Sequence, residues 1–174
     1  HRKQQQSMPI NIDTIKALRD LTSAGIMDCK SALEESDGDI AKAEEILRSK
    51  GIASAIKKST RETNQGLVES YIHSGGRIGA IVEANCETDF VARTDDFKAL
   101  AHNLAMQVAA MAPKYVDVSD IPDGDQENVE EVCLLQQPFI KDPSLSVQDL
   151  VREAAGKLGE NVQVRRFTRF ALGE

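Results

Sequence analysis

Residues 67–93 read LVESYIHSGGRIGAIVEANCETDFVAR, and this stretch decides the fold of the chain. Apolar and polar side chains alternate over residues 67–73 and again over 77–85, which predicts two β-strands. The glycines between them suit the tight turn of an antiparallel hairpin, because glycine tolerates positive φ angles. The chain then leaves the predicted sheet with an acid and an aromatic ring side by side, Asp89 and Phe90.

Residues 11–50, upstream of the hairpin, show helical spacing and predict three short helices. The third helix follows the turn SDGD, with Asp37 or Asp39 as its N-cap, and is expected to stop at Gly51. Residues 52–64 are mostly polar and are expected to form a helical connector. The first helix carries a predicted apolar stripe of Ile12, Ile15, Leu18 and Leu21.

Downstream, Thr94 is the predicted N-cap of a long helix that Pro113 closes. Ser146 is expected to open a further helix that ends at Gly159, and residues 161–172 alternate as a third strand. The segment between these two helices is predicted as a loop, a short helix near 129–135 and an extended stretch over 136–144. The buried stripe of the long helix is expected to comprise Phe97, Leu100, Ala101, Leu104, Val108 and Met111.

The fold class is therefore α+β: an N-terminal three-helix module followed by a small antiparallel three-stranded sheet packed with helices. The expected organisation is a tag remnant or disordered arm over residues 1–9, the helical module over 10–51, the connector over 52–64 and the α+β core over 65–174.

Charge and composition narrow the function. The net charge is −7, and residues 117–131 alone contain seven acids and no Lys or Arg, so the rest of the chain is balanced. An acidic chain with 4% aromatic residues is a poor candidate for binding nucleic acid directly. The basic cluster of Arg165, Arg166 and Arg169 is expected on a solvated or salt-bridged strand face. No stretch is long and apolar enough to span a membrane.

The residues offer little support for an enzyme or a metal site. The three histidines are scattered, and the three cysteines are far apart in the sequence. Glu83, Glu87 and Asp89 are close enough in sequence to suggest acid/base work or a bound cation, although a solvated acidic edge is the preferred interpretation. Cys29 next to Lys30 admits a reactive thiol, but a buried structural cysteine is preferred. We therefore expect no catalytic residue, metal or cofactor.

Two apolar sites remain open on the residues alone. Composition favours a core position for Phe90, since Phe is among the most buried residue types. Ile26 and Met27, at the start of the second predicted helix, are either packed or an exposed apolar pair.

Three motifs in order, LRDLTSAGIMDCKSALEESDGD at 18–39, NCETDFVAR at 85–93 and GENVQVRRF at 159–167, resemble the bacterial or organellar translation elongation factor Ts family. The resemblance runs from about residue 10 to 174. The family's TGAGMMDCK appears here as TSAGIMDCK, with Ser23 for Gly and Ile26 for Met. The resemblance implies nucleotide exchange on elongation factor Tu.

The resemblance also implies two contact surfaces. The helical module resembles a ubiquitin-associated domain and would dock on the partner's GTP-binding domain through Leu18, Arg19, Ile26 and Met27. The core would present Thr88, Asp89, Phe90 and Val91, with the Phe entering a hydrophobic slot near the partner's Mg²⁺ site. On this basis Phe90 is expected to be exposed.

Short members of this family are expected to form homodimers. Compared with longer members, this chain is expected to lack the second core subdomain, the protruding helical hairpin and the C-terminal module. Thr168 stands where a bridging thiol would sit, so the expected dimer is non-covalent. The expected location is the cytoplasm or an organelle matrix. Two other hypotheses are an adaptor whose helical module binds ubiquitin-like or other small domains, and a metal-dependent enzyme that uses Glu83, Glu87 and Asp89.

Overall fold

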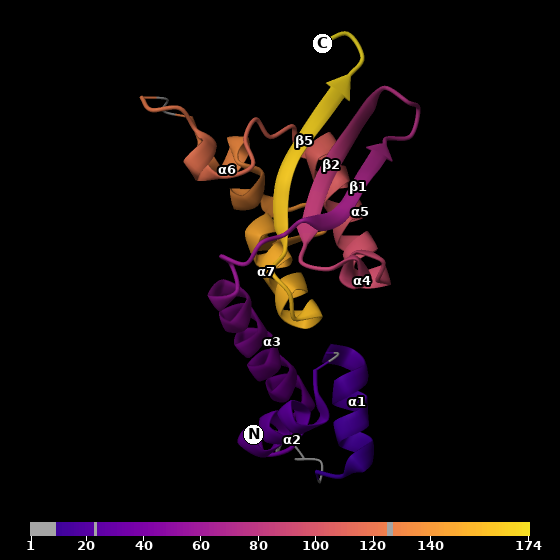
Figure 1. Cartoon of the computed structure of the whole chain (residues 1–174), viewed down its shortest axis with the longest axis vertical. Helices are drawn as coiled ribbons and strands as arrows, with labels where there is room; N and C mark the ends of the chain where they lie inside the picture. Colours follow the sequence, from indigo (N-terminus) through magenta and orange to yellow (C-terminus); the bar gives the residue numbers. More distant parts are fainter. Residues whose placement is uncertain (1–9, 23, 125–126) are drawn as a thin grey trace, which may run out of the picture.

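The structure is a computed structural model that describes residues 10–22, 24–124 and 127–174. The expectations for residues 1–9, Ser23 and Asp125 lie outside these ranges. Helices gather at one end of the molecule, a sheet with its own helices forms the other end, and α3 runs between them (Figure 1).

The N-terminal end consists of α1 (Ile12–Thr22), α2 (Ile26–Glu35) and the first turns of α3 (Ile40–Lys57). Asp39 is the N-cap of α3, and its side chain accepts a hydrogen bond from the Lys42 backbone N–H at 3.2 Å. These helices enclose a small core of Leu18, Cys29, Ala32, Leu33 and Ala43. The predicted stripe on α1 was wrong at its ends: Ile12 is 69% exposed and Leu21 is 56% exposed.

The prediction that the third helix stops at Gly51 was wrong. α3 continues without interruption to Lys57, so residues 52–57 belong to the same helix. Gly51 lies where α3 crosses α7 (Val147–Leu158), and a Cβ on Gly156 would lie 2.5 Å from the Gly51 carbonyl carbon. These glycines permit two helix backbones to approach closely, which is a packing role rather than a helix stop.

The sheet has the order β1-β2-β5, with β1 (Gln65–Ile72), β2 (Ile78–Cys86) and β5 (Gln163–Ala171) all antiparallel. The predicted hairpin turn closes with a hydrogen bond from the His73 N–H to the Ile78 carbonyl at 2.9 Å. Gly75 and Gly76 have φ angles of 95° and 71°, which explains the glycines at this turn. The α+β class and the three-stranded sheet are confirmed.

The main core lies between one face of this sheet and the helices α5 (Asp95–Met111) and α7. Thr94 caps α5 and Ser146 caps α7, as predicted from the sequence. Phe97 and Leu104 of α5 are completely buried, whereas Met111 was wrongly predicted to be buried and is 47% exposed. The opposite face of the sheet has no helix over it within the described residues.

The segment between α5 and α7 contains short elements: η1 (Val118–Asp120), α6 (Val129–Val132), η2 (Leu134–Gln136), β3 (Pro138–Phe139) and β4 (Asp142–Ser146). The pairing of β3 with β4 was not predicted, because a two-residue strand carries no periodicity. Buried Gln107 holds this segment: its side-chain N–H groups donate to Gln137 Oε1 and the Pro138 carbonyl, and its Oε1 accepts from the Ile140 N–H.

The crossing of α3 and α7 generates a stability prediction. We expect Gly156→Ala to lower the free energy of unfolding by about 1–3 kcal/mol, because the new methyl group meets backbone atoms that cannot move independently. Gly51→Ala is the matched control, since its Cβ has 3.4 Å to the nearest atom. Gly51→Ala should change the free energy of unfolding by less than about 1 kcal/mol, because the higher helix propensity of Ala offsets the slight crowding. Urea unfolding measures both, and equal stability of the two variants would contradict the close-approach argument.

Candidate functional site

The sequence-predicted residues 88–91 lie where the chain leaves β2, and we call them the tip segment. Thr88 is the N-cap of the short helix α4 (Asp89–Ala92), and its Oγ1 accepts a hydrogen bond from the Val91 N–H at 3.3 Å. Val91 packs against the main core, and Ala92 is buried. A helix of one turn has a single inward side, so Asp89 and Phe90 are left outside. Phe90 is 77% exposed.

Arg93 contacts both exposed residues, Asp89 and Phe90. Its guanidinium forms a salt bridge with the Asp89 carboxylate, and its Nε donates to the Asp89 carbonyl at 3.2 Å. The same guanidinium carbon lies 5.8 Å from the centroid of the Phe90 ring. Both members of the salt bridge are more than half exposed, so these contacts are weak and can be exchanged for contacts with another molecule.

The base of the tip segment is held from the interior side by Glu160, a residue that we did not single out from the sequence. Glu160 Oε1 accepts hydrogen bonds from the N–H groups of Glu87 and Thr88, at 3.1 and 3.0 Å. Its Oε2 accepts from Thr88 Oγ1 at 2.7 Å. The one sequence signal for Glu160 was that it belongs to the third motif, GENVQVRRF. It lies just before the predicted last strand.

Cys86, which is buried in the main core, also contacts the base of the tip segment. Its Sγ donates to the Thr88 carbonyl at 3.1 Å. Burial raises the pKa of the Cys86 thiol, and the nearby Glu160 carboxylate raises it further, so the thiol keeps the proton that it donates. Cys29, Cys86 and Cys133 are all buried and free, as predicted for structural cysteines.

The carboxylates considered for an enzyme have separate intramolecular partners. Glu83 pairs with Arg165 and Arg166 across the sheet, with Nε of Arg166 at 2.9 Å. The expectation of a salt-bridged strand face is thus confirmed for these two arginines. Glu87 Oε2 accepts a hydrogen bond from the Asn161 N–H at 2.7 Å, and Glu87 Oε1 lies 3.7 Å from Arg61 Nη1. Within residues 10–22, 24–124 and 127–174, no group of His, Cys, Asp and Glu is arranged to hold a metal ion.

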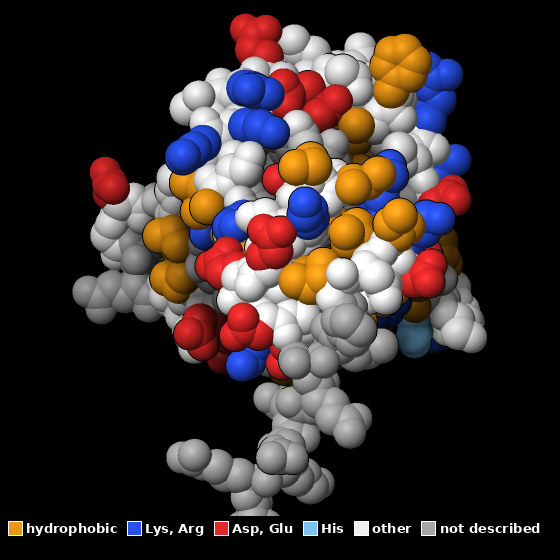
Figure 2. Space-filling model, turned by 90° about the horizontal axis from the view of Figure 1, so that it is seen from below, with side chains coloured by type: hydrophobic (Ala, Val, Ile, Leu, Met, Phe, Trp, Pro, Cys, Tyr) orange, Lys and Arg blue, Asp and Glu red, His pale blue; other side chains and the backbone are white. Residues whose placement is uncertain are grey.

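The second predicted surface lies at the N-terminal end of the molecule. Ile26 is 53% exposed and Met27 is 73% exposed, and Arg19 is also on the surface. Seen from that end, hydrophobic side chains lie beside one another among charged ones (Figure 2). Leu18, however, is completely buried between α1, α2 and α3, so its assignment as a partner contact was wrong. It stabilises the helices that carry the other three residues.

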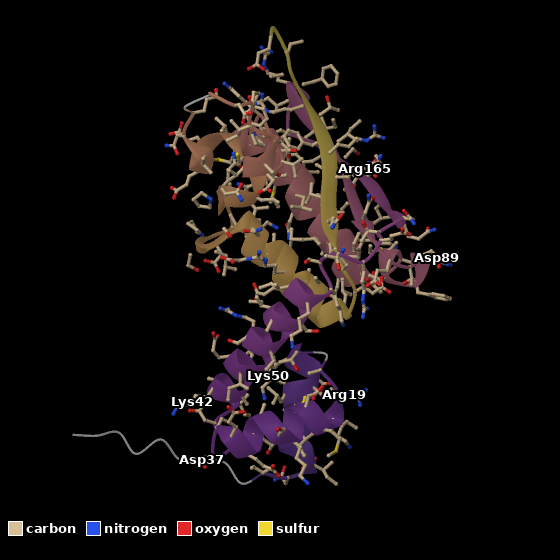
Figure 3. The ribbon with its side chains drawn as sticks, turned by 60° about the vertical axis from the view of Figure 1, so that its left-hand side comes forward. Arg19, Asp37, Lys42, Lys50, Asp89 and Arg165 are labelled. Atoms are coloured by element: carbon tan, nitrogen blue, oxygen red, sulfur yellow. The ribbon has the colours of Figure 1, made fainter. Side chains whose placement is uncertain are left out.

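Arg19 and the tip segment lie on the same side of the molecule. α4 stands above α1 in the view of Figure 1, and after a 60° turn the labelled Asp89 and Arg19 still lie on one side (Figure 3).

The outer face of the sheet is a third exposed surface. Its apolar residues are Val68 and Ile72 of β1, Ile81 of β2, Phe170 of β5 and the following Leu172, each between 44% and 73% exposed. The register places Gly79 between Ile72 and Phe170, which leaves a groove at this end of the sheet. No described helix is long and apolar enough to cross a membrane.

Known proteins resemble this chain over most of its length. The family model described as Elongation factor TS matches residues 11–128 and 124–174. Elongation factor Ts of Carboxydothermus hydrogenoformans is 49% identical, and the alignment covers 95% of this chain and 90% of that protein. The protein of the same name from Thermotoga neapolitana is 48% identical, with 96% and 99% covered. That from Rippkaea orientalis is also 48% identical, with 95% and 79% covered. The chain therefore belongs to the elongation factor Ts family.

Proposed function

We propose that this chain is a guanine nucleotide exchange factor that binds the GDP form of elongation factor Tu and promotes GDP release during translation elongation. The observation that carries the proposal is the 77% exposure of Phe90 in a family member. Single exposed apolar residues are common on protein surfaces, so the exposure of Phe90 supports a partner contact because the ring lies in the motif TDFV of a member of this family. The activity involves no covalent chemistry by this chain, and its setting is the cytoplasm or an organelle matrix.

In the proposed mechanism, Phe90 enters a hydrophobic slot between helices of the partner, close to the Mg²⁺ site. Protein interiors are close-packed, so an inserted ring displaces a helix instead of filling empty space. Mg²⁺ demands near-octahedral geometry and is held by few protein groups, so a small displacement of those groups weakens its binding. Once the metal is lost, repulsion by the diphosphate is less compensated and GDP leaves.

Asp89 takes part by changing its partner. In the free chain its carboxylate is paired with Arg93, whose guanidinium also lies beside the Phe90 ring. Because this pair is exposed, breaking it costs little, and Asp89 becomes available to polar groups of the partner when Phe90 is inserted.

Ile26, Met27 and Arg19 provide the proposed second contact, on the partner's GTP-binding domain. This contact raises the local concentration of the tip segment at the Mg²⁺ site. The two surfaces therefore have different roles: the N-terminal contact provides affinity, and the tip segment accelerates release. Linkage requires that GDP weakens the factor by the same ratio as the factor weakens GDP.

The outer face of the sheet is proposed as the surface of a non-covalent homodimer. Three strands each contribute exposed apolar side chains to one face, and an uncovered face of this kind favours association. Thr168 lies opposite Ile81 on this face, and the three cysteines are buried, so a disulfide between subunits is not expected.

The proposed role of Phe90 in GDP release is tested by the substitution Phe90→Ala. Burial of one Phe side chain contributes about 1.5–3 kcal/mol, and each factor of ten in rate corresponds to about 1.4 kcal/mol. We therefore expect the variant to lose about 10- to 100-fold of the stimulated release of fluorescent GDP from elongation factor Tu during a chase with excess GDP. Met111→Ala, which shortens another exposed apolar side chain, is the control and should retain full activity.

Each outcome separates hypotheses. If Phe90→Ala still stimulates GDP release, the residues that cause release are Asp89 or those of the N-terminal contact. No stimulation by the native chain, when it is folded and still binds through Ile26 and Met27, would favour the adaptor hypothesis.

The N-terminal contact is tested by Met27→Ala in a titration of the exchange reaction. We expect the concentration for half-maximal stimulation to rise several-fold while the maximal rate changes little, because only affinity is lost. Val118→Ala removes methyl groups from an exposed valine elsewhere and serves as the control. A fall in the maximal rate with unchanged half-maximal concentration would contradict the division of roles.

The dimer is tested by Ile81→Glu, which places a charge in the middle of the outer sheet face. Sedimentation equilibrium should give twice the chain mass for the native protein and a mass close to one chain for the variant, because burial of an unpaired carboxylate is costly. Met111→Glu adds the same charge on α5 and should remain dimeric. A native protein that sediments as a monomer at working concentration would refute the homodimer.

A further inference from the structure

The polar contacts beneath the tip segment connect segments that are far apart in the sequence. Glu160 binds the N–H groups of Glu87 and Thr88 and the Thr88 hydroxyl, across 72 or 73 residues of chain. Hydrogen bonds to a carboxylate acceptor are roughly twice as strong as those between neutral groups. These are the interactions that tie the base of the tip segment to the start of β5.

Glu160 is itself held in place by its neighbour. The Asn161 N–H donates to Glu87 Oε2 at 2.7 Å, so each of the two segments supplies a carboxylate to the backbone of the other. The Asn161 side chain, which is 4% exposed, donates to the carbonyls of Ser59 and Arg61 at 3.2 and 2.7 Å. The segment after α3 therefore supports Asn161 from the other side.

The outer part of the tip segment has no comparable support. The hydrogen bonds of Asp89 and Arg93 are made within α4 or its cap. They shape a helical turn but do not determine where that turn points. The Phe90 ring is exposed, and the guanidinium beside it belongs to Arg93, which is itself exposed. The direction of Phe90 therefore depends on the packing of Val91 and Ala92 and on the anchored base at residues 87–88.

We propose that Glu160 is a positioning residue for nucleotide exchange: it fixes the base of the tip segment so that Phe90 points outward before the partner arrives. The proposal rests on the proposed function of Phe90. A wedge that must displace a packed helix works best when it is rigid, because a mobile segment loses conformational entropy on insertion. Glu160 acts through this order and does not touch the partner.

The first test is the order of the tip segment in the free protein. We expect Glu160→Ala to speed hydrogen–deuterium exchange at the backbone amides of residues 87–93, since three acceptor contacts are lost. Glu160→Gln keeps the shape and one carbonyl acceptor and should have a smaller effect. Glu130→Ala, at an exposed glutamate of α6, is the control. Unchanged exchange at residues 87–93 in Glu160→Ala would overturn the proposal.

The second test asks whether Glu160 acts through Phe90. Glu160→Ala should lower the maximal rate of stimulated GDP release several-fold and leave the half-maximal concentration nearly unchanged. In a Phe90→Ala background the same substitution should have almost no further effect, since there is no ring left to position. Equal losses in both backgrounds would show a general structural role and would overturn the proposal.

Loss of folding and loss of exchange activity are distinguished by separate measurements on the Glu160 variants. Urea unfolding identifies a variant that fails to fold, and Glu160→Gln then remains for both tests. If the native chain does not accelerate GDP release, the proposed function fails, whereas hydrogen exchange still decides whether Glu160 orders the tip segment.

Discussion

The antiparallel pairing of β2 with β5 is the interaction on which the other features depend. β2 is the central strand, and its inward residues Val82 and Ala84 are completely buried against the helices. Because β5 runs antiparallel to it, the start of β5 lies beside the end of β2, with Gln163 opposite Asn85. That arrangement brings Glu160 and Asn161 to the exact turn where the chain leaves the sheet, and it leaves the apolar side chains of the opposite face without cover.

The pairing also explains how one chain combines a rigid core with an exposed aromatic ring. Val91 and Ala92 attach α4 to the core, and the acceptor groups of Glu160 satisfy backbone N–H groups that the end of a strand leaves unpaired. The segment that exposes Phe90 to water is therefore stabilised on its inward side by the packing of Val91 and Ala92 and by the hydrogen bonds of Glu160. The close crossing of α3 and α7 at Gly51 and Gly156 joins the N-terminal helices to the same core. As a result, both proposed contact surfaces belong to one continuous structure.

Charge has a structural role in several of these contacts. Glu83, Glu87 and Asp89, which form an acidic run in the sequence, are each directed to a different partner: the arginines of β5, the Asn161 backbone and Arg93. A hydrogen bond from Asn85 and the contacts of Arg166 and Arg165 lower the pKa of Glu83, so this carboxylate stays charged over the physiological range. A run of acids thus indicated a possible site, but the fold uses two of them to connect strands and loops.

The sequence by itself determined the longer helices, the three strands of the main sheet and several helix caps. Thr94 and Ser146 were recognised as N-caps, Asp39 was one of two candidates, and the hairpin glycines were recognised as a turn, because these signals depend on neighbours within a few residues. The motifs also carried the family. Exposure was predicted less well: for Phe90, which is 77% exposed, composition favoured burial and the resemblance favoured exposure, whereas Leu18, which the resemblance placed at the surface, is completely buried. The contacts of Glu160 and the passage of α3 through Gly51 were likewise decided only by the tertiary structure, because each depends on residues that lie 72 or more positions away in the chain and are brought close by folding.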